Sequence, residues 1–172
     1  AVSGGTLVLT GSNSTTAAIT INNGGTLEVG SLANLGTSPV YFNAGSTEGN
    51  RATLALRSDG STTIARNAAG NAGGSIDQVA EFNVDRATAG GPLGGTITWG
   101  NGGTMVFNND RGQLLVTGAN GYGLTLAQNF SWAGNNQTNK PNLVNNAPGL
   151  LTIAGNLTAQ TDAKGQTVTL AY

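Results

Sequence analysis

The stretch Gly24-Gly25-Thr26-Leu27-Glu28-Val29-Gly30 decides the fold of this chain. After a glycine pair, Leu27 and Val29 share one side of a short run, Thr26 and Glu28 take the other, and a third glycine ends the run. This alternation is typical of a half-buried β-strand between turns. We therefore expect Leu27 and Val29 to point into a core, and the glycines to lie at corners of the chain.

Variants of this stretch recur along the 172 residues, so one structural unit is reused. Short strands that recur along a chain with turns between them suit either a β-sandwich or a solenoid. Repetition favours the solenoid, because each coil of a solenoid buries its inward face only against its neighbours. The abundance of Asn and Thr at turns points the same way, since stacked coils bring like residues within reach of amide or hydroxyl ladders. The variants lie at 4–11, 94–100, 102–107 and 149–155.

The predicted fold is all-β: a right-handed parallel β-helix, or β-solenoid, forming a single domain over residues 1–172. Two stretches without alternation, near 67–74 and 135–148, are expected to be loops. Residues 75–84 are expected to form a strand or strand pair, with a helix as the alternative. The remaining strands are expected at 6–10, 17–21, 26–29, 39–42, 52–57, 62–65, 95–99, 104–107, 113–117, 123–127, 129–132, 150–154, 156–159 and 167–170.

The composition excludes several classes of function. Charged residues make up 9% of the chain, against a typical ~25%. The net charge is −1 and the seven Lys and Arg are scattered, so nucleic-acid binding is not expected. The chain has neither cysteine nor histidine, which removes disulfides, thiolate nucleophiles and histidine metal sites. No apolar run approaches the ~20 residues that span a bilayer, so membrane insertion is not expected.

The first part of the chain resembles a known family. Residues 4–13, 19–30 and 35–42 resemble the autotransporter-associated β-strand repeat, also called the passenger-associated transport repeat. The resemblance covers roughly the first 56 residues and returns near 149–159. It implies a right-handed parallel β-helix exposed outside a bacterial cell as a passenger, stalk or fibre. The chain departs from the family in that no membrane barrel follows the repeats and an aromatic residue is missing around Ser14 to Ala17.

An enzymatic hypothesis rests on the carboxylates of Asp77, Glu81 and Asp85, which would share one face of a strand. Clustered carboxylates serve as acid, base or metal ligands in enzymes that cleave polysaccharides. Residues four apart on a strand lie about 13 Å from each other, whereas catalytic pairs need about 5 to 9.5 Å. We therefore predict no catalytic residue, no cofactor site and no enzyme activity.

Two further groups of residues suggest binding. The turns Ser58-Asp59-Gly60 and Asn108-Asn109-Asp110 offer oxygen ligands for calcium, but too few carboxylates, so no metal site is predicted. The aromatic residues Trp99, Tyr122 and Trp132 are candidates for surface contacts, either between subunits or by stacking on sugars.

The ends of a β-helix expose unpaired strands, which free monomers normally cap. The sequence shows no cap at either end, so we expect end-to-end stacking with copies of the chain, or continuation in a larger repeat protein. The candidate assembly strands contain Thr6, Leu7, Val8 and Leu9 at one end and Val168, Thr169 and Leu170 at the other.

The first functional hypothesis is a non-enzymatic extracellular structural protein that acts as a fibre subunit or surface stalk. The chain itself is then the expected partner. The alternatives are a carbohydrate- or host-binding adhesin that uses aromatic residues and the Asn-rich loop at 135–146, and a polysaccharide-cleaving enzyme.

Overall fold

The computed structural model describes residues 1–43, 51–70, 79–107, 113–132, 142–159 and 169–171. Within these ranges nearly all regular structure is β-strand, beside one 3-10 helix, η1 (Leu32–Leu35). The all-β prediction is confirmed. The strands are β1 (Gly5–Leu9), β2 (Ile19–Asn22), β3 (Gly25–Val29), β4 (Val40–Asn43), β5 (Ala52–Arg57), β6 (Thr62–Ile64), β7 (Ala68–Gly70), β8 (Val79–Asp85), β9 (Thr96–Trp99), β10 (Thr104–Phe107), β11 (Gln113–Gly118), β12 (Gly123–Leu126), β13 (Asn129–Trp132), β14 (Asn142–Asn145), β15 (Leu151–Ile153), β16 (Leu157–Ala159) and β17 (Thr169–Ala171).

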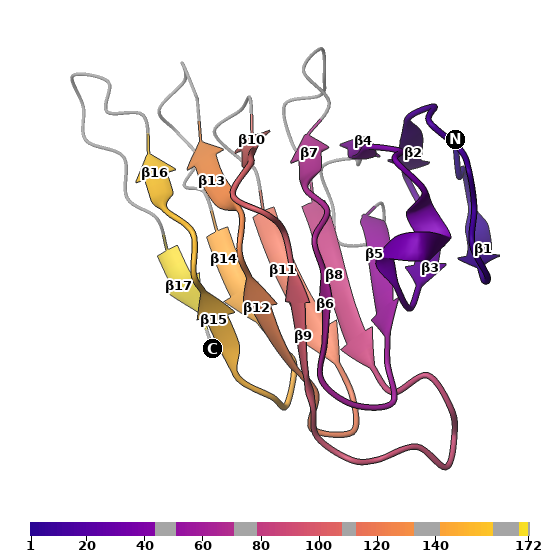
Figure 1. Ribbon diagram of the computed structural model, residues 1–172. Coiled ribbons are helices and arrows are strands. Elements are labelled where there is room, and N and C mark those ends of the chain that lie inside the picture. The colour runs from indigo at the N-terminus through magenta and orange to yellow at the C-terminus, as the bar shows by residue number, and fades with distance from the viewer. Residues whose placement is uncertain (44–50, 71–78, 108–112, 133–141, 160–168, 172) are drawn as a thin grey trace.

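The strands form parallel sheets whose order follows the chain. The largest sheet runs β1-β3-β5-β8-β11-β14-β17, a four-stranded sheet runs β6-β9-β12-β15, and two three-stranded sheets run β2-β4-β7 and β10-β13-β16. From β5 onward the strands follow a cycle of three, in which every strand up to β14 except β7 pairs in parallel with the strand three places later. The strand β7 pairs with β4 instead, and β10 begins a separate sheet. Figure 1 shows β1 at one end of the row of strands and β15 to β17 at the other.

The stretch at residues 24–30 folds as predicted. It forms β3, in which Leu27 and Val29 are buried while Thr26 and Glu28 are half-buried. Gly24 has a φ of 71°, and a Cβ on Gly25 would lie 2.4 Å from the carbonyl oxygen of Val2. The glycine pair is therefore required where the chain turns into β3.

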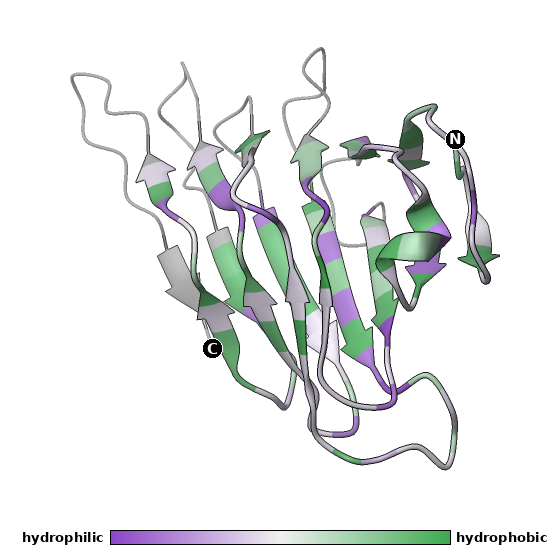
Figure 2. Ribbon diagram, in the orientation of Figure 1, coloured by the Kyte–Doolittle hydropathy of each residue, from purple (hydrophilic) through white to green (hydrophobic). Residues whose placement is uncertain are grey.

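One core joins the sheets. Its buried side chains include Leu54 and Phe82 from the largest sheet, Ile97 from the four-stranded sheet, and Phe42 and Phe130 from the two smaller ones. The rings of Phe42 and Phe82 are 5.5 Å apart between centroids, and a tryptophan ring lies 6.0 Å beyond Phe82. Hydrophobic and hydrophilic positions alternate along β8, as Figure 2 shows, because successive side chains point to opposite faces of a strand.

Ladders of like side chains run across the strands, as predicted. Asn43 Nδ2 donates to Asn22 Oδ1 over 2.9 Å, and Asn22 Nδ2 donates to Ser3 Oγ over 2.7 Å. On the outer face of the four-stranded sheet one register position is threonine in all four strands, at Thr63, Thr98, Thr125 and Thr152.

Two predicted loops contain strands. Within 67–74, Ala68 to Gly70 form β7, which pairs with β4 in the register Val40↔Ala68. Within 135–148, Asn142 to Asn145 form β14. Both predictions were wrong at these residues, because neighbouring strands supply the pairing that the local sequence does not signal.

The strand prediction at 75–84 is confirmed where the structure describes it, since Val79 to Asp85 form β8 and not a helix.

Candidate functional site

The strand β1, predicted as an assembly strand, forms one edge of the largest sheet. Leu7 occupies the register position of Leu27 and Leu54, whose side chains are in the core. Leu7 is nevertheless 40% exposed, whereas Leu27 is fully buried. Val8, on the opposite face, is 50% exposed. Among the described residues, an inward-facing position is therefore left uncovered at this edge.

The residues before β1 fix its position. Val2 forms a parallel bridge with Ile21 of β2, and its N–H donates to the carbonyl of Thr20 over 2.7 Å. Gly4 and Gly5 both have a φ of 68°, a conformation that favours glycine and turns the chain from that bridge into the strand. Residues 2–3 therefore extend one small sheet while β1 extends the largest sheet.

At the opposite end, β15, β16 and β17 are the last strands of their sheets. Leu157 of β16 occupies the register position of Phe130, which is fully buried, yet Leu157 is 40% exposed. Thr169 and Leu170 lie in β17, where Leu170 pairs with Leu143 of β14. Val168 lies outside the described residues. As at β1, an inward position at this end, that of Leu157, is left uncovered because no further strand follows among the described residues.

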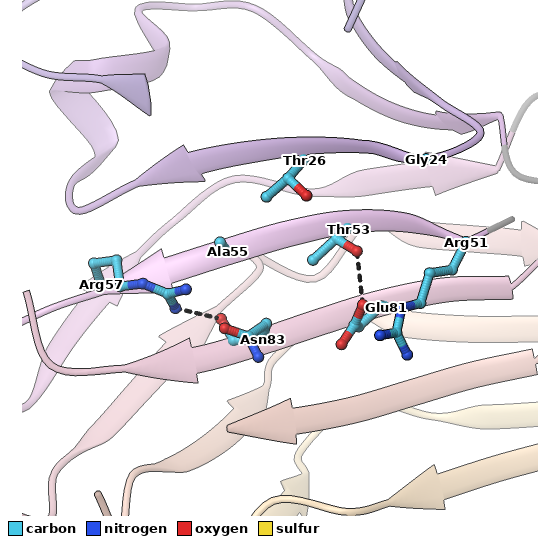
Figure 3. A pocket seen from close by; sticks show the side chains of 8 residues that line it. All are labelled: Gly24, Thr26, Arg51, Thr53, Ala55, Arg57, Glu81 and Asn83. Carbon is cyan, nitrogen blue, oxygen red and sulfur yellow. Dashed lines mark hydrogen bonds and ion pairs between the residues drawn. The ribbon is translucent and has the colours of Figure 1, made fainter. Parts of the chain in front are cut away.

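A polar depression of about 410 Å³ lies on the outer face of the largest sheet, over β3, β5 and β8 (Figure 3). At one side Arg51 Nε pairs with Glu81 Oε2 over 2.8 Å. At the other, Arg57 Nε pairs with Glu28 Oε2 over 3.3 Å, and Arg57 Nη1 donates to the carbonyls of Leu56 and Asn83. The lining residues are Gly24, Thr26, Arg51, Thr53, Ala55, Arg57, Glu81 and Asn83.

The carboxylate of Glu81 is buried and fully engaged. Thr53 Oγ1 donates to Oε2 over 2.6 Å, Thr117 Oγ1 donates to Oε1, and Arg51 supplies the opposite charge. In Asp85, Oδ1 accepts bonds from the Asn120 amide over 2.7 Å and the Arg86 N–H over 2.8 Å. Separate partners therefore hold these two members of the predicted carboxylate trio, and Asp77 lies outside the described residues.

The turn at Asp59, which offers oxygen ligands but was not predicted to bind a metal, has a structural role. Asp59 Oδ1 accepts the N–H groups of Ala87 and Thr88, each over 3.0 Å. These bonds, foremost that from the Thr88 backbone, hold the pKa of the Asp59 carboxyl below its ordinary value of 3.8. Within the described ranges, no three Asp, Glu, His or Cys side chains gather as metal ligands. The second turn with oxygen ligands, at 108–110, lies outside those ranges.

The prediction of surface contacts is wrong for Trp99 and Tyr122, because both side chains are fully buried. Trp99 lies on the inward side of β9 together with Ile97. The two residues are two positions apart in the sequence, which places them on the same face of a strand. The hydroxyl of Tyr122 accepts the N–H of Gly60 over 3.0 Å. Trp132 lies in β13, and its side chain is outside the described ones.

Gln128 is a buried polar residue that the sequence did not single out. Its Oε1 accepts the Ala68 N–H over 2.9 Å and the Trp99 Nε1–H over 3.1 Å, while Nε2 donates to the Ala68 carbonyl over 3.2 Å. Gly100 leaves room for this corner, since a Cβ there would lie 2.7 Å from the Gln128 nitrogen. The amide therefore gives β7 both bonds that a neighbouring strand would otherwise supply.

No protein family matches this chain, and neither does any curated protein or solved structure. The resemblance to autotransporter repeats therefore stays a prediction from the sequence. Within the described residues, no helix has the length and apolar character to cross a membrane.

Proposed function

We propose that this chain is a section of a right-handed parallel β-helix that serves as a non-enzymatic structural protein. The cycle of three strands, the parallel pairing and the single core shared by all four sheets support a solenoid. Right-handed winding is proposed because connections between parallel strands of one sheet are right-handed in about 98% of cases. Stiffness would come from the strand pairing that runs along the whole row of strands.

The same architecture supports assembly through the end strands. The observation that carries this step is that Leu7 and Leu157 occupy inward register positions at opposite ends and are both 40% exposed. A further strand placed on each edge would bury them and pair the edge backbone. The occupant we propose is a second copy of this chain, stacked head to tail.

The proposed place of action is outside a bacterial cell. The sequence resemblance to autotransporter repeats supports this location, and so does the lack of cysteine, because a chain that crosses an outer membrane unfolded is better without disulfides. The proposed absence of catalysis is supported by the carboxylates of Glu81 and Asp85, which are occupied by structural partners.

The test is assembly of the purified chain, followed by light scattering over a range of concentrations and by electron microscopy. The wild type is expected to form unbranched filaments. Val8→Lys places a charge on the outer face of the edge strand and should abolish them, because lysine on an edge opposes strand addition. Thr98→Lys makes a matched charge change on the interior strand β9 and should assemble normally. A wild type that stays monomeric at millimolar concentration would refute self-assembly.

A further inference from the structure

The polar depression on the outer face lies over interior strands, away from the edge strands of the proposed assembly. Its side chains come from three neighbouring strands, and their outward positions are set by the register Thr26↔Thr53↔Glu81. Figure 3 shows Arg51 at one side of the depression and Arg57 at the other, with the threonines and Asn83 between them. This arrangement places two guanidinium groups and a rank of hydroxyls around one open space.

The acceptors of the depression are largely occupied. Both oxygens of Glu81 are engaged, Oε2 by Arg51 and Thr53 and Oε1 by Thr117. The Asn83 amide nitrogen is also used, because it donates to Thr117 Oγ1 over 2.7 Å. An incoming ligand therefore gains little by offering hydrogen-bond donors to the Glu81 carboxylate.

The donors, by contrast, remain open. The ion pair of Arg51 runs through Nε, and its guanidinium has no partner besides Glu81 among the described residues. Its side chain is 41% exposed, whereas that of Glu81 is 5% exposed, so the solvent meets the cation and not the anion. The hydroxyl of Thr26 also has no hydrogen-bond partner among the described residues. The site thus offers the fork of N–H donors that binds carboxylates in bidentate geometry.

We propose that this depression binds a carboxylate-bearing saccharide, a uronate unit of an acidic polysaccharide. The carboxylate takes the terminal nitrogens of Arg51, and ring hydroxyls bond to the Thr26 hydroxyl and to the side-chain oxygen Oδ1 of Asn83. A saccharide fits better than a peptide, because among the described lining residues Ala55 has the only apolar side chain, and these residues form no apolar pocket for a peptide side chain. This site is separate from the end strands and goes beyond the scaffold function.

The test is calorimetric titration with an oligogalacturonate, with a neutral galactose oligomer and an oligoglutamate as comparison ligands. The titrations use the Val8→Lys background, so binding is measured whether or not the wild type assembles. The oligogalacturonate is expected to bind at least tenfold more tightly than either comparison ligand. Equal binding of the neutral oligomer would overturn the role of the carboxylate, and equal binding of oligoglutamate would overturn the choice of a saccharide.

Three variants locate the site. Arg51→Ala is expected to weaken oligogalacturonate binding about tenfold, which corresponds to about 1.4 kcal/mol. Arg86→Ala removes the same charge outside the depression and should bind like the parent. Thr26→Val removes one hydroxyl with no folded-state partner among the described residues, keeps the side-chain shape, and should weaken binding about threefold. Equal losses in Arg51→Ala and Arg86→Ala, or full binding by both Arg51→Ala and Thr26→Val, would overturn the site.

Discussion

Replacing Gln128 by leucine should strongly destabilise the fold, because a single buried amide satisfies three groups. The side chain is fully buried and bonds the N–H and carbonyl of Ala68 and the indole N–H of Trp99. Leucine has a similar size but leaves all three groups unpaired, and each buried unpaired group costs about 1–3 kcal/mol. After the gain from burying a leucine, we expect a loss of about 3–5 kcal/mol. That is a large fraction of the 5–15 kcal/mol that typically stabilises a domain.

The assay is equilibrium unfolding in urea, followed by circular dichroism. Gln113→Leu is the matched control, since Gln113 is half-buried at an outward position and makes no side-chain hydrogen bond among the described residues. It should change the free energy of unfolding by less than about 0.5 kcal/mol. In a Trp99→Phe background, Gln128→Leu should cost about 1–2 kcal/mol less, because the indole donor is already gone. A loss below about 1 kcal/mol in the wild-type background would refute the bridging role.

Three other perturbations test the packing and the charges. Gly100→Ala should lower the free energy of unfolding by more than about 2 kcal/mol, because φ at Gly100 is 112° and the new Cβ would lie 2.7 Å from facing backbone. Gly90→Ala, which has open space around the new Cβ, should be nearly neutral. Urea unfolding measures both. Glu81→Gln should lower the free energy of unfolding by about 1.5–3 kcal/mol, since Arg51 and two threonine hydroxyls lose a charged acceptor. Thermal unfolding measures this loss, and an unchanged Tm would contradict the prediction. The folded-state pKa of Asp59 lies below its ordinary value of 3.8, which an NMR titration of the carboxyl should confirm. The bonds to Asp59 therefore add stability that is fully present above the unfolded pKa and is lost as pH falls through the folded pKa. This contribution to the pH dependence of stability should vanish in Asp59→Asn.

The strands that could be predicted are those in which local alternation and tertiary burial agree. In β3 and β5, apolar residues alternate with polar or small ones, and β3 lies between glycines. The strand β7 could not be found this way, because Ala68-Ala69-Gly70 has no alternation and is held by β4 and by the distant Gln128. The strand forms because residues distant in the sequence pair with it, and the sequence of the segment itself does not show this pairing.

The candidate sites were harder to predict than the strands, since they depend on register. Arg51 pairs with Glu81 because Thr53 lies opposite Glu81 in the strand register. The connections between strands differ in length, so this register could not be predicted from the sequence. The edge strand β1 needed no register and was placed correctly as a strand. Trp99, predicted at the surface, is buried because it lies on the same side of β9 as Ile97.

Uncharged amide side chains satisfy the backbone at two corners of this fold. At one corner, Asn34 Oδ1 accepts the N–H groups of Gly30 and Ser31 over 2.9 and 2.8 Å, while Nδ2 donates to the Gly11 carbonyl over 2.8 Å. Gln128 does the same at another corner, with donor and acceptor on one side chain. A carboxylate could accept the same N–H groups, but it could not donate to a carbonyl and would bury a charge. At these two corners both kinds of backbone group lie within reach of one side chain, so an amide fits there and a carboxylate does not.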